Sequence, residues 1–423
     1  MILKRLDRKR IKLSGTGGQL AFSAFSQLVR YGAPLLFYPI FIRTVSTEDF
    51  AVFVLCMAAG QTIGQFTEFG FGLSAVRALT HKDENENGGA LAFGQVMCGK
   101  LLMLSVSAPI YVLISFMISQ DFLVVENVVL PILIGFSYGF TPNWYYIGVR
   151  RAHLLAMGEI LVSLTQLVLV LLLVHEGSGF VIMVMTMTLP ILGLSLLGQI
   201  QAFRALSFRA PSRAEMWTGI RTAYHFFVAS NAPALTNRLF ILILGAMSTA
   251  TQVAIYAAAE RIVSAAVNML TPMMRVLLPR VTVLYAESPS AAFVWFRRVL
   301  ILLSGFYIIA TFTVIVTVDW WVPLVFGRDF AKAAGVIAVF LLVAPLSTMS
   351  RIVGLLWLVP SQLEASYQRV TLVCCALGLL VALPVGREGA TEMAILRVFI
   401  EVCILLGCVV VLLRSCRRAP EKL

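Results

Sequence analysis

The chain has 423 residues, of which 59% are hydrophobic and 13% are charged, and it carries a formal net charge of +12. Soluble globular proteins have an apolar share nearer half and a charged share nearer a quarter, so this composition excludes that class and indicates a polytopic membrane protein. The positive charge gathers in loops and tails, which favours a topology signal and argues against nucleic-acid binding.

Apolar stretches of about 18 residues or more are typical of transmembrane helices, and they predict an all-α membrane protein with twelve spans. The predicted spans are 15–42, 50–79, 90–118, 124–149, 153–174, 179–203, 216–246, 251–278, 292–318, 330–359, 364–383 and 390–413. The apolar part of the first span is about twice as long as that of a signal peptide, so we expect it to be retained.

The distribution of Lys and Arg predicts the orientation of these spans. Roughly twenty basic residues fall in the tails and in the loops on the side of the termini, against about four on the other side: Arg43, Arg328, Lys332 and Arg387. We therefore expect a multi-pass membrane protein with both termini in the cytoplasm.

The loops and cysteines argue against an enzyme and against a metal protein. The longest interhelical loop, around 204–216, has no room for a folded domain, so we expect no catalytic residues outside the membrane. The seven cysteines fall inside spans or in the C-terminal tail without a C-x-x-C pair, which predicts neither disulfides nor a metal site. No cofactor is expected either.

A weak internal repeat predicts two lobes of six helices each. A shift of 203 residues brings 48–53 onto 251–256, Arg77 onto Arg280, and Pro142 onto Pro345. We predict an N-terminal lobe (1–204), a cytoplasmic linker (205–216) and a C-terminal lobe (217–423), with a cavity between the lobes near the midplane. Chance agreement within a biased composition is the alternative.

Three arginines, Arg30, Arg238 and Arg261, fall near the middle of predicted spans. An arginine at the bilayer centre costs roughly 2.5 to 3.5 kcal/mol, so each must face a hydrated cavity or a partner. A cationic cavity suits an anionic ligand, and a guanidinium pairs with phosphate through two parallel hydrogen bonds.

Three uncharged residues, Gln27, Asn231 and Asn268, share predicted spans with these arginines. With Arg351, which lies in the predicted span 330–359, they complete the predicted substrate-binding set. The alternative for the uncharged members is hydrogen bonding between helices. Glu68 and Glu260 are either counter-ions of the arginines or carboxylates that titrate or bind a cation during transport. Arg397 and Glu401 are spaced to neutralise one another.

Prolines inside the predicted spans should kink them, because proline removes a backbone donor and its ring clashes with the preceding turn. They are Pro34, Pro142, Pro233, Pro272 and Pro345.

Four segments resemble one transporter family. They are EFGFGLSAVR (68–77), PNWYYIG (142–148), LPRV (278–281) and VFGRDFAKA (325–333). With the twelve-helix plan, nearly the whole chain resembles the Wzx-type polysaccharide (O-antigen or exopolysaccharide) flippases of the multidrug/oligosaccharidyl-lipid/polysaccharide (MOP) exporter superfamily. Glu68 departs from the pattern, where an Asp is more usual, and this puts its role in ion coupling in doubt.

The resemblance implies two lobes in a V that inverts between inward-open and outward-open states. It implies an undecaprenyl-pyrophosphate-linked glycan as cargo, with membrane lipids, a polysaccharide polymerase and a chain-length regulator as further partners. It also implies transport driven by a proton or sodium gradient, and the chain has no Walker-type nucleotide-binding motif.

Other functions remain open at this point. A multidrug exporter would be expected to carry acidic residues in the first span, which has none. A lipid II flippase of the same superfamily would have two further helices. A membrane-embedded polymerase or glycosyltransferase would need a large outer loop, and a scaffold would leave the midplane arginines without a purpose.

Overall fold

A computed structural model describes residue 29, residues 32–33, 35–80, 87–118 and 124–418. Gln27, Arg30 and Pro34, which the sequence singles out, lie outside these residues. The described residues form helices and no strand, which confirms the all-α fold class. Nine of their helices are long and apolar enough to cross a membrane, or ten if a bent pair counts as one span. The count of twelve stays a prediction.

The first half of the chain contains a short apolar helix, Leu35–Thr44, followed by α2 (Thr47–Glu68), α3 (Phe71–Thr80), α4 (Asn87–Ile118), α5 (Val125–Gly139), α6 (Asn143–Gly148), α7 (Ala152–Leu173) and α8 (Phe180–Leu206). The second half contains α9 (Arg213–Met247), α10 (Ala250–Asn268), α11 (Leu270–Glu287), α12 (Pro289–Val316), α13 (Val318–Phe326), η3 (Arg328–Ala333), α14 (Ala334–Leu341), α15 (Val343–Val353), η4 (Gly354–Leu358), α16 (Glu364–Val385) and α17 (Ala390–Arg418).

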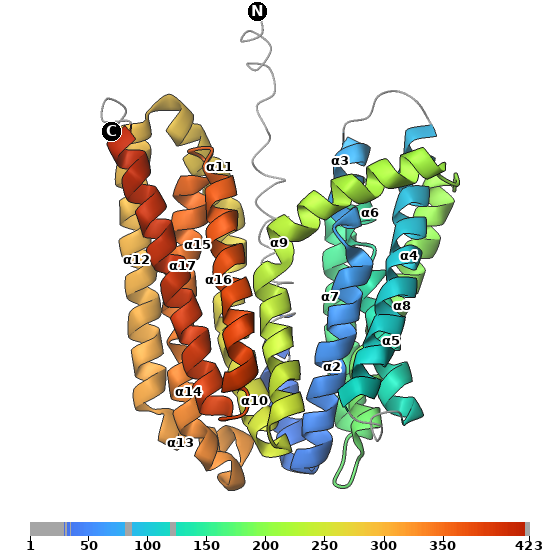
Figure 1. Cartoon of the computed structure of the whole chain (residues 1–423), viewed down its shortest axis with the longest axis vertical. Coiled ribbons are helices and arrows are strands. Elements are labelled where there is room, and N and C mark those ends of the chain that lie inside the picture. The colour runs from blue at the N-terminus through green and yellow to red at the C-terminus, as the bar shows by residue number, and fades with distance from the viewer. Residues whose placement is uncertain (1–28, 30–31, 34, 81–86, 119–123, 419–423) are drawn as a thin grey trace, which may run out of the picture.

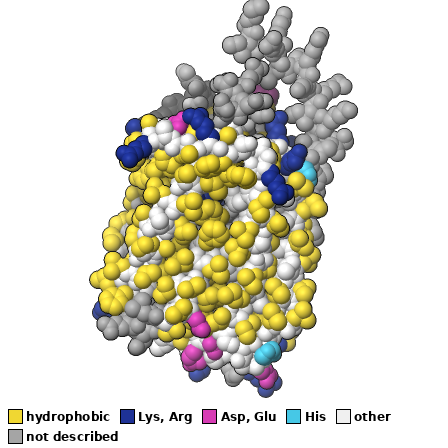
Figure 2. Space-filling model, turned by 90° about the vertical axis from the view of Figure 1, so that its right-hand side faces the viewer, with side chains coloured by type: hydrophobic (Ala, Val, Ile, Leu, Met, Phe, Trp, Pro, Cys, Tyr) yellow, Lys and Arg dark blue, Asp and Glu magenta, His cyan; other side chains and the backbone are white. Residues whose placement is uncertain are grey.

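The helices form two bundles that meet at one end and diverge toward the end where α17 finishes (Figure 1). Helices α2 to α8 pack mainly on one another, and α10 to α17 do the same. Helix α9 contacts both groups, because it touches α2, α3 and α4 as well as α10 and α16. On the face shown in Figure 2, hydrophobic side chains cover the middle and charged ones gather toward the two ends, as in a multi-pass membrane protein.

Several predicted spans are not continuous helices, and prolines explain most of the breaks. The predicted spans 124–149, 251–278 and 330–359 divide before Pro142, Pro272 and Pro345, respectively. A proline cannot donate to the carbonyl one turn earlier, so the helix is interrupted just ahead of it. The helices are thus interrupted at three of the prolines that the sequence predicts to disturb them. The segments on the two sides of Pro272, and likewise of Pro345, still form one candidate membrane span, Ala250–Glu287 and Phe330–Leu358.

The predicted span 50–79 divides without a proline. Phe69 (φ 42°) and Gly70 (φ 79°) adopt left-handed conformations between α2 and α3. The Glu68 carboxylate accepts hydrogen bonds from the backbone N–H groups of Gly70 and Gly72, both at 2.8 Å. It thereby satisfies donors at the start of α3 that have no partner within the helix.

The break at Pro142 leaves backbone carbonyls that two long side chains satisfy. The ammonium of Lys100, only 1% exposed, donates to the Gly139 carbonyl oxygen at 2.8 Å. The side-chain amide of Gln199 donates to the carbonyl oxygen of Phe140 at 2.6 Å. Carbonyls at a helix end need such partners, so the buried lysine has a structural role here.

Helix α9 consists of two arms at 74° to each other, 213–227 and 231–247, with Pro233 just after the bend. The connection from α8 spans residues 207–212, shorter than the predicted linker. We call 213–227 the outer arm and 231–247 the inner arm. The bend turns the outer arm across the bundle, over the first lobe (Figure 1).

The outer arm is anchored on the N-terminal half of the chain. The rings of Phe69 and Phe227 stack with centroids 4.9 Å apart. Gly70 lies so close to the arm that a Cβ there would be 2.4 Å from the Ala223 carbonyl oxygen. The side chain of Gln95 donates to the Glu215 carbonyl oxygen at 2.8 Å. The outer arm thus packs with α3 and α4, although it follows the connection between the halves.

Candidate functional site

Arg238, on the inner arm of α9, connects the two bundles through hydrogen bonds. Its Nε donates to the Gln61 side-chain oxygen at 3.3 Å, and its NH1 donates to the side-chain oxygen of Gln65. Gln65 in turn donates to the side-chain oxygen of Asn231 at 2.8 Å. Two predicted site residues, Arg238 and Asn231, therefore belong to one network with two glutamines of α2.

Arg261 lies in the same region, on α10. Its guanidinium carbon is 5.4 Å from the ring centroid of Tyr38, a distance typical of a cation–π contact. Glu260 and Arg261 are both within electrostatic range of Arg238. The structure thus gathers two of the three predicted arginines at the interface between the bundles.

The two predicted carboxylates have different surroundings. Glu68 accepts from the backbone at the start of α3, and Glu260 accepts a hydrogen bond from the Ser264 hydroxyl one turn later on α10. Within the described residues, neither forms an ion pair with a lysine or arginine. Their assignment as counter-ions or coupling groups stays a prediction.

Asn268 and Arg351, also predicted as site residues, lie outside the Arg238 network among the described residues. Asn268 is the last residue of α10, at the break before α11. Arg351, on α15, is half-buried in the C-terminal bundle, with Tyr307 and Tyr367 as electrostatic neighbours.

A buried ion pair on α17 lies against the inner arm of α9. Arg397 and Glu401, each 5% exposed, are joined at 2.6 Å, which confirms the predicted neutralisation. Arg397 Nε also donates to Asn237 Oδ1 at 2.9 Å. Neighbouring residues of α9 therefore bind different bundles: Asn237 binds α17 and Arg238 binds α2.

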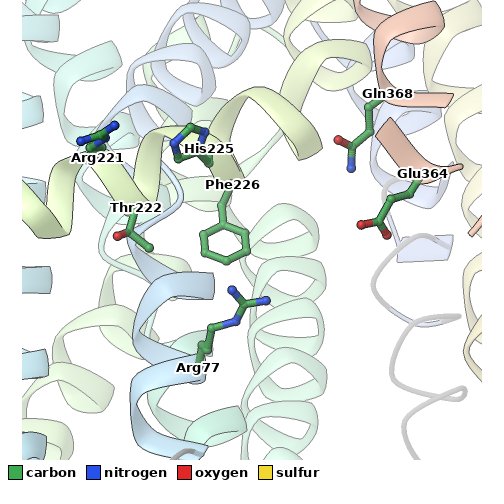
Figure 3. A pocket seen from close by; sticks show the side chains of 7 residues that line it. All are labelled: Arg77, Arg221, Thr222, His225, Phe226, Glu364 and Gln368. Atoms are coloured by element: carbon green, nitrogen blue, oxygen red, sulfur yellow. The ribbon is translucent and has the colours of Figure 1, made fainter. Parts of the chain in front are cut away.

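A cavity of about 570 Å³ opens between the bundles at the end where α16 begins (Figure 3). One side is formed by α3 and the outer arm, and the opposite side by α16. The lining residues are Arg77, Arg221, Thr222, His225, Phe226, Glu364 and Gln368. None of them is in the predicted site. The spacing of Arg221 and His225, one turn apart on the outer arm, is a signal for its cationic side alone.

Comparison with known proteins identifies the family. The family described as "Polysaccharide biosynthesis protein" matches residues 19–284, more than half of the chain. The chain belongs to this polysaccharide biosynthesis family. Its membership and fold confirm the resemblance inferred from the four sequence segments.

One protein of similar sequence is the "Putative O-antigen transporter" of Escherichia coli (strain K12). It is 22% identical over 385 residues, covering 86% of this chain and 88% of the relative.

Two solved structures share the fold. A lipid II flippase MurJ in an inward closed conformation has a TM-score of 0.71 at 10% identity, over 93% of this chain and 87% of that one. An inward-facing multidrug resistance MATE transporter of the MOP superfamily has a TM-score of 0.66 at 13% identity, over 94% and 98%. These relatives are named for transport and not for catalysis.

Proposed function

We propose that this protein is a flippase for undecaprenyl-pyrophosphate-linked oligosaccharide repeat units in surface polysaccharide biosynthesis. It moves them from the cytoplasmic to the periplasmic leaflet by alternating access. The observation that carries the proposal is the gathering of Arg238 and Arg261 between two bundles, in a chain of the polysaccharide biosynthesis family. Two permanent positive charges within predicted membrane spans require an anionic partner or a hydrated cavity.

The contacts of Arg238 suggest how cargo and conformation are linked. Its present acceptors are neutral amide oxygens of α2. A diphosphate offers charged oxygens, and hydrogen bonds to ionised acceptors are roughly twice as strong as neutral ones. An arriving diphosphate would therefore compete for the guanidinium and loosen the contact that joins the bundles. Cargo binding would in this way favour the rearrangement that carries the cargo across.

The remaining assignments follow from this function. A proton or sodium gradient would drive the cycle without a bound cofactor, with Glu68 and Glu260 as the candidate coupling groups. Both termini would be cytoplasmic in the bacterial inner membrane, so the diverging end would open toward the cytoplasm. A polymerase and a chain-length regulator would act on the exported units.

A clean deletion in the source organism tests the function. Surface polysaccharide should disappear, and undecaprenyl-linked repeat units should accumulate. Wild-type protein expressed from a plasmid should reverse both effects. Normal surface polysaccharide in the deletion strain, in the absence of a second flippase, would refute the proposal. Altered drug sensitivity with normal polysaccharide would instead favour a multidrug exporter.

A further inference from the structure

The cavity between the outer arm of α9 and α16 lies apart from the Arg238 network and has its own set of charges. Arg77 comes from α3, and Arg221 and His225 come from the outer arm. Arg221 and His225 are one turn apart, so both lie on one side of the arm (Figure 3). Three groups that carry or can accept a positive charge thus line one side of a cavity large enough for a diphosphate.

The outer arm beside this cavity carries exposed aromatic residues of the kind that lie at the level of lipid headgroups. Trp217 and Tyr224 on the outer arm are 67% and 51% exposed. Such residues are enriched where a membrane meets water, because one end of the side chain is apolar and the other polar. The 74° bend is consistent with this depth, since a spanning inner arm leaves the outer arm nearly parallel to the membrane.

The cationic side of the cavity is held in place. The Arg77 guanidinium carbon lies 5.2 Å from the ring centroid of Phe226, which restricts the arginine side chain. The outer arm itself is fixed by the close approach of Gly70 to Ala223 and by the stacking of Phe69 on Phe227. The site therefore needs little ordering when a ligand arrives, which favours binding.

We propose that this cavity binds the phosphate groups of a lipid headgroup and that a diphosphate is preferred over a single phosphodiester. The preference follows from Arg221 and His225, which lie one turn apart on the same side of the arm (Figure 3), since a diphosphate can engage both at once. One part of this inference rests on the proposed function. If the protein is a flippase, the cavity is the entry site where the diphosphate of the cargo binds before it reaches Arg238.

The opposite side of the cavity carries a carboxylate, which limits how tightly an anion binds. Glu364 and Gln368 are one turn apart on α16 and face the cationic side (Figure 3). The carboxylate of Glu364 repels an anion and so keeps the affinity moderate. An entry site must have moderate affinity, because a headgroup held too tightly would not move on.

Binding to purified full-length protein in lipid nanodiscs tests the proposal with two probes, farnesyl diphosphate and phosphatidylglycerol. The double variant Arg77→Gln/Arg221→Gln should raise the Kd for farnesyl diphosphate at least about tenfold, as expected for lost charge-assisted hydrogen bonds. Arg298→Gln is the control, because this exposed arginine lies on α12, outside the cavity lining. It should leave the Kd unchanged.

A second variant, Glu364→Gln, separates a change in the site from misfolding. It should lower the Kd for farnesyl diphosphate, and a damaged fold does not bind a ligand more tightly. Loss of phosphatidylglycerol binding alone in the double variant would identify the ligand as an ordinary phospholipid headgroup. Unchanged binding of both probes in the double variant, or unchanged binding in Glu364→Gln, would overturn the proposal.

The binding assay and the deletion experiment can fail separately. If the deletion strain keeps its surface polysaccharide while the cavity variants lose diphosphate binding, the flippase function fails and the site remains. If the deletion removes the polysaccharide while binding in the cavity variants is unchanged, the function remains and the entry site fails.

Discussion

Gly70→Ala should destabilise the protein by releasing the outer arm of α9. Two costs add at this position. The φ of 79° places an alanine in the left-handed region, which costs roughly 1 to 2 kcal/mol. The new Cβ would also lie 2.4 Å from the Ala223 carbonyl oxygen and 2.9 Å from the Phe227 nitrogen. Both are backbone atoms that cannot turn aside, and such overpacking costs about 1 to 3 kcal/mol.

The expected loss is therefore roughly 2 to 5 kcal/mol. The measurement is the thermal midpoint of the purified protein in detergent, followed by tryptophan fluorescence, since Trp217 lies on the outer arm. Gly193→Ala is the matched control, because Gly193 is helical and a Cβ there meets nothing within 4 Å. It should be neutral or stabilise by up to about 1 kcal/mol. Equal midpoints for the two variants would refute the proposed anchoring.

Three further predictions concern transport and pH. Arg238→Ala should abolish complementation of the deletion at normal membrane levels, and Arg238→Lys should restore only part, because an ammonium lacks the planar fork; full activity of the alanine variant would contradict the cargo role. Cysteines at Phe226 and Gln368, joined across the cavity by a bifunctional maleimide in a cysteine-free background, should block transport, and the same reagent should reduce transport less with either single cysteine; equal transport by the double and single cysteine variants after treatment would contradict movement of the two sides. The backbone N–H of Ser212 holds the pKa of Glu215 below its usual range. The stability that this carboxylate gives the first turn of α9 is therefore present above its unfolded pKa and lost as pH falls through the lower folded value. Hydrogen exchange in that turn should show this pH dependence, and Glu215→Gln should remove it.

The sequence was sufficient for features that depend on local chemistry. Apolar length predicted the membrane helices, and proline chemistry predicted the interruptions at Pro142, Pro272 and Pro345. The spacing of Arg397 and Glu401 predicted their ion pair, because an i, i+4 separation places two side chains together on any α-helix. These inferences needed no knowledge of how distant segments meet.

Features that depend on distant contacts were missed. Nothing local to Lys100 indicates that its ammonium satisfies a carbonyl at the Pro142 break, 39 residues away. The outer arm was assigned to the C-terminal lobe by its place in the chain, whereas its contacts with Gly70 and Gln95 attach it to α3 and α4. The cavity at its edge was missed for the same reason, because its two sides lie far apart in the sequence.

The most direct test of the central claim follows the cargo across the membrane. Spheroplasts of the deletion strain, lacking the polymerase that consumes repeat units, would be treated with a membrane-impermeant glycosidase that cleaves the repeat unit. With the protein supplied from a plasmid, the undecaprenyl-linked units should become accessible from outside. Without it, or with Arg238→Ala in its place, they should stay protected. Equal accessibility with and without the protein would contradict the flippase function.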